Sequence, residues 1–492
     1  MSNFNVYIDG SILVLYIIGT LTLGIWVRKY VQNVNDYLLA GRKVDLYLGI
    51  ASLAATEFGI VSCMANAELG YKYGFAGITP GIALALAMFV VGWTGFCIKP
   101  LREQGVITIP ELFEQKFGSK VRWASGLVIV LGGLLNMGVF LRMGGDFLTL
   151  VLGIDTAYLE ILMTALLLIV AVYTILGGML SVLVTDYLQF IMMNIGLISV
   201  SLLFIFGFGW ENLVLHLEES YGAPAFNPFV DGQYGWDRVI LDFLVAFAVI
   251  LTWQTIIARV LAAKNAKIAQ KIYIGTAPYW IVRFALPAVF GIAAFYYFSE
   301  LGELPEKDIL AMPQLIAAKV PIGLLGIVVA AMLAADMSTN SSYLLAWSSV
   351  IYNDILQPFH KNQWSEKKSL YVNRMLVAGI GIFLLLYGLW YPLKGDLWVY
   401  MQVTGTIYLA SMSVILIAAC YWDKANNWGA MAAIFVGSII PISFLLLQQM
   451  ESTSDLAEQI GPYKSGIATY LLTALAMIAA SHAKRRFGKQ TE

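Results

Sequence analysis

The sequence predicts an all-α integral membrane protein, because it combines few charges, long uncharged apolar runs, and basic residues that gather between alternate runs. Of the 492 residues, 59% are hydrophobic and only 12% are charged, whereas soluble domains carry about a quarter charged residues. Residues 73–98 and 187–210 contain no Asp, Glu, Lys, Arg or His. Each run is long enough to cross a hydrocarbon core of about 30 Å as a helix. A soluble bundle would need polar helix faces, which these runs lack.

Hydropathy, read together with turn and charge signals, predicts about thirteen transmembrane helices. They cover residues 10–27, 46–70, 75–98, 122–151, 157–177, 180–208, 238–258, 273–298, 313–350, 375–393, 397–421, 428–448 and 464–482. The ninth is too long for one straight crossing, so we expect it to begin with a short helix on the outer surface.

Spans two to six and spans seven to eleven form two groups of five. An odd number of helices gives the two groups opposite orientations, which is typical of inverted-repeat transporters. The predicted organisation is an N-terminal extra span with its loop (1–45), a first five-helix repeat (46–208), an external loop (209–237), a second repeat (238–421), and two C-terminal spans with a short tail (422–492).

The positions of Lys and Arg predict the orientation of the chain. With the N-terminus outside, about 22 of the 30 Lys and Arg residues fall in cytoplasmic segments, as the positive-inside rule requires. The clusters occupy residues 28–43, 99–122, 259–271, 361–374 and 484–489, and the third begins at Arg259. We therefore expect a multi-pass protein of the cell membrane with its C-terminus in the cytoplasm. No basic residue precedes the first apolar run, so the N-terminus does not resemble a cleaved signal peptide.

Ionisable side chains inside membrane spans are costly and indicate function. Six lie deep enough in the predicted spans to matter: Glu57, Arg142, Asp146, Asp186, Arg283 and Asp336. Arg142 and Asp146 are four residues apart and are expected to form an intrahelical ion pair. Asp336 either faces a cytoplasmic cavity or neutralises a nearby base, and the sequence assigns it no specific role.

Two polar clusters suggest a cation site. Asp186 follows a predicted turn at residues 177–178, and Ser338, Ser341 and Ser342 share one helix face by their spacing. Hydroxyls, backbone carbonyls and one carboxylate suit a monovalent hard cation better than Ca²⁺. The alternative is that these hydroxyls only allow close helix packing and bond back to the backbone.

Four motifs resemble the signature of the sodium:solute symporter family. They are Tyr173-Thr-Ile-Leu-Gly-Gly178 with Thr185-Asp-Tyr-Leu-Gln189, Asp36-Tyr-Leu-Leu-Ala-Gly-Arg42, Ile107-Thr-Ile-Pro-Glu111 and Met337-Ser-Thr339. The family includes bacterial proline, pantothenate, sialic acid and galactose carriers and animal glucose, iodide and choline carriers. The resemblance covers nearly the whole chain and implies a five-plus-five inverted-repeat (LeuT-like) core. It also implies that spans two and seven are broken at the middle of the bilayer.

The resemblance implies one sodium site and permits a second. The first would use the backbone carbonyls of Ala55, Phe58 and Ala335 and the side chains of Ser338 and Thr339. A broken helix supplies such carbonyls, because carbonyls in a continuous helix are already hydrogen-bonded. The possible second site would use Asp186, Ser338, Ser341 and Ser342. Na⁺ is therefore the expected ion, with one or two ions per cycle.

The resemblance places the solute beside the broken helices, near Glu57, Trp253, Gln254, Arg283 and Gln402. Arg283 and Gln402 match sugar-contacting positions of glucose and galactose carriers. The glutamate that those carriers use in core helix two has no counterpart in this sequence, which disfavours a hexose.

Three of these residues allow more than one interpretation. Trp253 either binds a quaternary ammonium group by cation–π attraction or packs as an ordinary membrane-core aromatic. Glu57 and Arg283 either contact opposite ends of a zwitterion, such as an amino acid or betaine, or neutralise each other in a salt bridge.

The expected function is sodium-coupled symport of a small polar solute by alternating access, with a zwitterion favoured. A sugar or monocarboxylate solute is an alternative, as is a proton in place of sodium. A membrane sensor that keeps the transporter fold is a hypothesis of a different class. A channel would need a filter repeated by symmetry, and the phosphate-binding motif GxxxxGK[ST] does not occur. We expect no enzyme activity, no nucleic-acid partner and a monomer.

Overall fold

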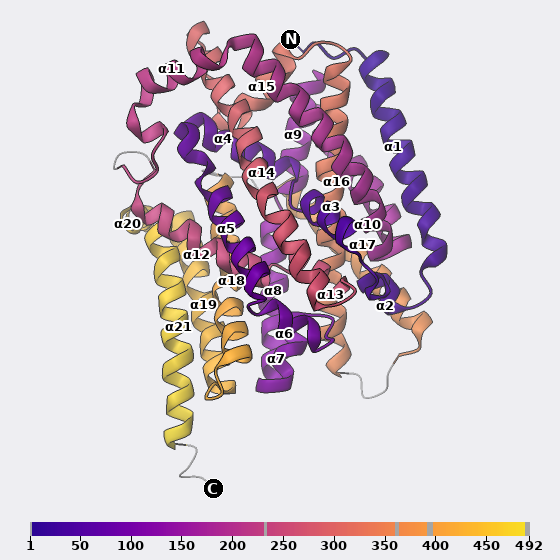
Figure 1. The fold of residues 1–492 in the computed structure, drawn as a ribbon, viewed down its shortest axis with the longest axis vertical. Helices are drawn as coiled ribbons and strands as arrows, with labels where there is room; N and C mark the ends of the chain where they lie inside the picture. Colours follow the sequence, from indigo (N-terminus) through magenta and orange to yellow (C-terminus); the bar gives the residue numbers. More distant parts are fainter. Residues whose placement is uncertain (1, 231–233, 360–363, 391–396, 488–492) are drawn as a thin grey trace.

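The computed structural model describes residues 2–230, 234–359, 364–390 and 397–487. Eleven helical stretches in these residues are long and apolar enough to cross a membrane. The all-helical class is therefore confirmed, whereas the predicted count of thirteen spans is not. The end of predicted span 375–393 and the basic residues Lys361 and Lys489 lie outside the described residues. Figure 1 shows the two chain termini at opposite ends of the bundle.

The described residues up to Phe208 form ten α-helices. They are α1 (Ile8–Val27), α2 (Val34–Leu39), α3 (Leu46–Thr56), α4 (Ile60–Tyr73), α5 (Thr79–Thr94), α6 (Ile98–Glu103), α7 (Ile109–Phe117), α8 (Ser119–Met137), α9 (Phe140–Leu152) and α10 (Leu159–Phe208). Two predicted spans, 157–177 and 180–208, fall within the single element α10, which is one reason for the lower count. Gly178 interrupts α10 with a non-helical backbone (φ 53°, ψ −146°). A Cβ atom there would lie 2.4 Å from the backbone oxygen of Tyr37, so only glycine allows α2 to pack against this break.

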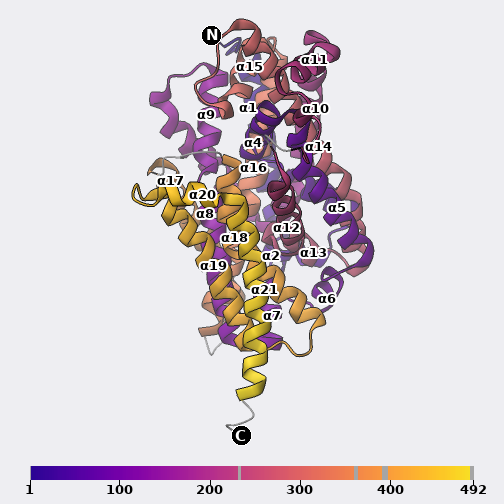
Figure 2. The same ribbon diagram turned by 90° about the vertical axis from the view of Figure 1, so that its left-hand side faces the viewer.

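The described residues after Phe208 form eleven further α-helices. They are α11 (Trp210–Tyr221), α12 (Trp236–Thr252), α13 (Gln254–Ala262), α14 (Ala266–Leu301), α15 (Ala311–Lys319), α16 (Leu324–Val350), α17 (Glu366–Trp390), α18 (Leu397–Tyr421), α19 (Asn427–Gln449), α20 (Ser454–Ile460) and α21 (Pro462–Phe487). The long ninth span is indeed preceded by a separate short helix, α15. Helices α19 and α21 pack side by side (Figure 2).

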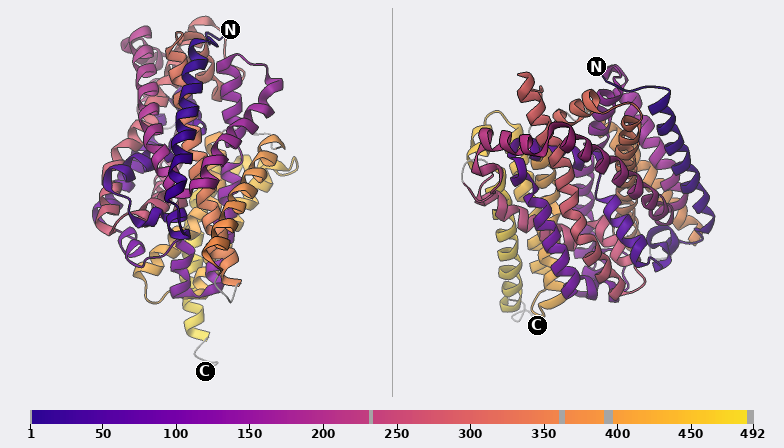
Figure 3. Two further views of the ribbon diagram at one scale, coloured as in Figure 1. Left: turned by 90° about the vertical axis from the view of Figure 1, so that its right-hand side faces the viewer. Right: turned by 45° about the horizontal axis from the view of Figure 1, so that its top comes forward.

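Helix α1 runs along the outside of the bundle, as the left view of Figure 3 shows, and packs against α10 and α16. The buried carboxylate of Asp9 holds it there. Oδ1 of Asp9 accepts hydrogen bonds from the backbone N–H groups of Gly323 (2.7 Å) and Gly326 (2.8 Å). These amides belong to the first turn of α16, where unpaired N–H groups and the helix dipole favour a negative charge.

Two helix breaks meet α16 near its middle. Helix α3 ends at Thr56 and α4 begins at Ile60, while Trp253 separates α12 from α13 in an extended conformation (φ −65°, ψ 116°). The breaks fall in predicted spans two and seven, as the resemblance implied. Gly59 lies in the first break, and a Cβ atom on it would lie 2.8 Å from Oγ1 of Thr339. The close packing of α16 against this break depends on that missing Cβ atom.

Candidate functional site: a cavity and a polar network between two helix breaks

A cavity of about 110 Å³ lies beside the two helix breaks. Four of the five predicted solute-binding residues line it: Glu57, Trp253, Arg283 and Gln402. Gln254, the fifth, is buried outside this lining. The structure therefore brings together side chains from the two helix breaks, α14 and α18 that are far apart in the sequence.

Glu57 and Arg283 both line the cavity, yet they form no direct ion pair among the described residues. Oε1 of Glu57 accepts a hydrogen bond from the hydroxyl of Thr255 (2.6 Å). The guanidinium of Arg283 lies over the ring of Trp280, 4.5 Å from its centroid. Nε of Arg283 has no hydrogen-bond partner in the described part of the chain. In this conformation the two charges do not neutralise each other by direct contact.

Two further carboxylates line the cavity, Asp242 and Asp336. Asp242 accepts hydrogen bonds from the hydroxyl of Tyr234 (2.5 Å) and the amide of Gln402 (2.9 Å). Burial and the nearby Asp242 carboxylate raise the pKa of Tyr234 well above its usual value, so its hydroxyl keeps the proton that it donates. Oδ2 of Asp336 has no hydrogen-bond partner among the described residues. Asp336 was predicted from the sequence to lie deep in a span, whereas Asp242 was not, although it also lies inside a predicted span.

Arg238, one helical turn before Asp242, is also buried and was also overlooked. Its guanidinium lies over the rings of Tyr73, Tyr234 and Tyr463, at 4.5, 4.3 and 5.3 Å from their centroids. Aromatic faces attract a cation, so this cage stabilises a positive charge at the start of α12. An Arg–Asp pair at spacing i, i+4 in a predicted span was the available signal.

Trp253 forms a wall of the cavity and is fixed by other aromatic rings. Its ring stacks on Tyr408 (centroids 5.6 Å apart) and meets Tyr343 edge-on (5.7 Å). Its Nε1 donates a hydrogen bond to the hydroxyl of Tyr343 (3.1 Å). The indole is thus a packed core residue that also faces the cavity, so the two interpretations of Trp253 are compatible.

The residues of the predicted first sodium site are all buried where α16 crosses the α3–α4 break. The hydroxyl of Thr339 donates to the carbonyl of Thr56 (2.9 Å). The carbonyl of Ala55 accepts from the N–H of Phe58 (3.2 Å). Ser338 points elsewhere, because its hydroxyl donates to Asp186.

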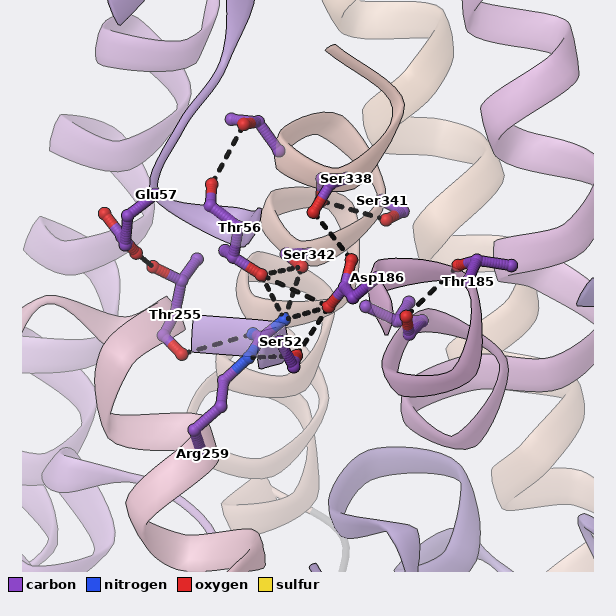
Figure 4. A network of polar contacts seen from close by, with 12 residues as sticks. Ser52, Thr56, Glu57, Thr185, Asp186, Thr255, Arg259, Ser338, Ser341 and Ser342 are labelled. Carbon is purple, nitrogen blue, oxygen red and sulfur yellow. Dashed lines mark hydrogen bonds and ion pairs between the residues drawn. The ribbon is translucent and has the colours of Figure 1, made fainter. Parts of the chain in front are cut away.

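Asp186 is the centre of a buried polar network (Figure 4). Oδ1 accepts from Ser338 (2.6 Å), and Oδ2 accepts from Ser52 of α3 (2.5 Å). Ser341 donates instead to the carbonyl of Ser338 (3.0 Å). The hydroxyl of Ser342 lies 2.9 Å from that of Thr56. Of the residues predicted for a second site, Asp186 and Ser338 are therefore in direct contact, whereas Ser341 bonds within its own helix.

The network contains a cation from the chain itself. Nη2 of Arg259, in α13, lies 3.2 Å from Oδ2 of Asp186, and the side chain of Arg259 is 1% exposed. The assignment of Arg259 to a cytoplasmic basic cluster was therefore wrong. The reason is that α13 follows the break as a short buried helix and returns its side chain to the centre of the bundle. A buried carboxylate at Asp186, which needs a counter-charge, was the signal that could have identified it.

The predicted ion pair between Arg142 and Asp146 is confirmed. Nε of Arg142 lies 3.8 Å from Oδ1 of Asp146 within α9. The two side chains are 40% and 32% exposed, and neither lines the cavity. This pair is a surface feature of α9.

Comparisons with known proteins agree with this architecture. The model of the sodium:solute symporter family matches residues 37–437. The sodium/glucose cotransporter 4 of Danio rerio is 26% identical, covering 96% of this chain and 77% of that protein. The osmoregulated proline transporter OpuE of Bacillus subtilis is 24% identical, covering 96% of this chain and 94% of that protein. The sodium/myo-inositol cotransporter 2 of Mus musculus is 27% identical, covering 89% of this chain and 70% of that protein.

Solved structures share the fold. A sodium-coupled sialic acid symporter in its substrate-bound outward-open state superimposes with a TM-score of 0.82, at 20% identity and covering 97% of each chain. The transporter MhsT in complex with L-phenylalanine gives a TM-score of 0.53 at 13% identity, covering 88% of this chain and 97% of that one. The five-plus-five LeuT-like fold is therefore the fold of this chain.

Proposed function

Because the chain belongs to the sodium:solute symporter family, it is a sodium-coupled symporter, and we propose that its solute is a small zwitterion such as an amino acid or a betaine. The main support for a zwitterion is that Glu57 and Arg283 line one cavity without a direct ion pair between them in the described residues. A buried charge without a partner costs several kcal/mol. A solute with one ammonium group and one carboxylate would compensate both charges. The proline transporter among the relatives shows that zwitterionic solutes occur in the family.

The other charges of the cavity favour a solute with a cationic end. Asp336 adds a carboxylate to that of Glu57, against the single guanidinium of Arg283 in the lining. The third acid, Asp242, lies one helical turn from the buried guanidinium of Arg238. A monocarboxylate would satisfy Arg283 and increase the excess of negative charge. A neutral sugar would bring no charge to either side. An ammonium group near the acids and a carboxylate near Arg283 match the lining best.

We propose that the coupled sodium ion binds at the first site, to the carbonyls of Ala55, Phe58 and Ala335 and the hydroxyls of Ser338 and Thr339. Sodium at these atoms would clamp the α3–α4 break onto α16. Glu57 lies in the same break, so the ion and the solute would organise one segment. Linkage then requires each ligand to raise the affinity of the other by the same factor.

The arrangement also supports alternating access. The cavity is lined by α4 and α12, whereas α3 and α13 are tied to α10 and α16 by the network around Asp186. We propose that the cavity opens alternately to the two sides of the membrane. On one side, α3 and α13 would move away from α10 and α16 to release the solute. The predicted orientation makes that release cytoplasmic.

A thermal-shift screen of the purified protein would test the solute class. Amino acids, betaines, monocarboxylates and sugars would be added in sodium chloride or in choline chloride. A zwitterion should raise the melting temperature by mass action, and more in sodium than in choline. A shift with sugars or monocarboxylates alone would refute the zwitterion proposal.

Charge-neutralising variants would test whether Glu57 and Arg283 bind the solute. Glu57→Gln and Arg283→Gln should each abolish the shift caused by the zwitterion, and the double variant should not recover it. Arg142→Gln removes a charge outside the cavity lining and should keep the shift. Recovery in the double variant would show that Glu57 and Arg283 serve only each other.

A further inference from the structure

The guanidinium of Arg259 lies in an environment made of cation ligands. Its Nη2 donates to the hydroxyls of Thr56 (2.5 Å) and Ser342 (2.6 Å) and to Oδ2 of Asp186 (3.2 Å). Its Nε donates to the hydroxyl of Ser52 (3.2 Å). One carboxylate and three hydroxyls therefore face a positive charge that the protein itself supplies.

Three helices provide these ligands, and a fourth provides the cation. Ser52 and Thr56 come from α3, Asp186 from α10, Ser342 from α16, and Arg259 from α13. In Figure 4 the guanidinium lies between Ser52, Asp186 and Ser342. Nη1 of Arg259 also donates to the carbonyl of Thr255 (3.2 Å), one turn earlier in α13. All three guanidinium nitrogens of Arg259 are thus hydrogen-bonded, which fixes the position of the charge.

We propose that Arg259 is the resident cation of the second site, so that it excludes a second sodium ion and the transporter moves one sodium ion per solute. The reason is electrostatic repulsion between the guanidinium and a second cation. Asp186 and Arg259 are both fully buried, and like charges repel strongly where water does not screen them. A sodium ion beside Asp186 would meet the guanidinium on the same carboxylate. Each of the hydroxyls that it would need, except that of Ser341, already bonds to Asp186 or Arg259.

The same contacts of Arg259 also affect how the transporter closes. It ties α13 to α3, α10 and α16 without an ion, so this half of the molecule can close when only the first site is loaded. In a protein with two bound sodium ions, closure would instead wait for the second ion. A tethered cation therefore makes closure independent of a second sodium-binding event.

The inference rests on sodium-coupled transport, and a flux ratio tests it directly. Proteoliposomes containing the wild-type protein would be given labelled sodium and a labelled solute found in the thermal-shift screen. We expect one sodium ion per solute and a Hill coefficient of one for sodium. Two sodium ions per solute would overturn the inference and leave sodium-coupled transport intact. Uptake without any dependence on sodium would instead refute the coupled function.

Variants of Arg259 supply a readout that does not require transport. Arg259→Gln should lower the melting temperature in choline chloride, because Asp186 loses its counter-charge. Sodium should then raise the melting temperature of this variant more than that of the wild type, since the ion can now reach the carboxylate. The double variant with Asp186→Asn should lose this extra sodium effect, and Arg259→Lys should resemble the wild type. An equal sodium effect in wild type and Arg259→Gln would overturn the inference.

Discussion

Gly59→Ala tests the packing that positions the proposed sodium site. Gly59 lies in the α3–α4 break with φ −96° and ψ 168°, which any residue can adopt. The added Cβ atom would lie 2.8 Å from Oγ1 and 3.3 Å from Cγ2 of Thr339. The substitution therefore introduces no backbone strain, and its effect falls on the side chain of Thr339.

The size of the effect on sodium affinity follows from the contacts that Thr339 loses. The least costly response is rotation of this side chain, which breaks its 2.9 Å hydrogen bond to the carbonyl of Thr56. Losing a hydrogen bond costs about 0.5–1.5 kcal/mol, and overpacking costs about 1–3 kcal/mol. If about 1–2 kcal/mol of this is lost from ion binding, the apparent sodium affinity falls roughly 5- to 30-fold.

The assay is the sodium concentration that gives half-maximal solute uptake into proteoliposomes. Thr339→Val should raise this concentration to a similar extent, because it removes the same hydroxyl. Gly19→Ala is the control, since a Cβ atom at that position of α1 meets nothing within 4 Å. A folded Gly59→Ala protein with an unchanged sodium requirement would show that Thr339 is not a ligand of the ion.

Four further substitutions test other contacts of the structure. Asp186→Asn and Arg259→Gln should each destabilise the protein by about 3–5 kcal/mol, because each leaves a buried charge without its partner; the double variant should lose less than the sum, as measured by thermal unfolding in a double-mutant cycle. Tyr234→Phe removes the 2.5 Å hydrogen bond to Asp242 and should cost about 1.5–3 kcal/mol, measured as a lower melting temperature. Gly291→Ala would place a Cβ atom 1.8 Å from a backbone oxygen of α4, so we expect little folded protein by size-exclusion chromatography, whereas the glycine control in α1 should behave as the wild type.

Much of the fold could be predicted from the sequence, because membrane helices are defined by local composition. Long uncharged runs identify apolar helices without knowledge of their neighbours. Helix breaks are harder to predict. Trp253, for example, lies in a stretch whose composition predicts one continuous apolar span from 238 to 258. Only the resemblance to known transporters indicated that this span is interrupted. The break within α10 is the opposite case, because the turn predicted at residues 177–178 coincides with the non-helical backbone of Gly178.

The site could be predicted only in part, because some of its residues form an unusual local pattern and others do not. Ser338 and Ser342 are recognisable because four hydroxyls in five residues are unusual in an apolar span. Asp242 was overlooked because it lies near the start of a span, where a polar residue could equally face water. The cavity itself is formed by side chains of several helices, so its lining depends on tertiary packing that no local pattern contains.

Arg259 is the residue for which a general rule gave the wrong answer, and charge balance gives the right one. The positive-inside rule groups it with the basic residues that follow it, yet it lies only five residues beyond the start of α13, about 7.5 Å along a helix. Every deeply buried carboxylate needs a counter-charge or hydrogen-bond donors. Asp186 obtains Arg259, and Asp354 obtains an arginine of α8 at 2.9 Å. Among the described residues Glu57 accepts a hydrogen bond from Thr255 and Arg283 lies over the ring of Trp280, yet neither contacts an opposite charge. A solute can therefore supply that counter-charge to each.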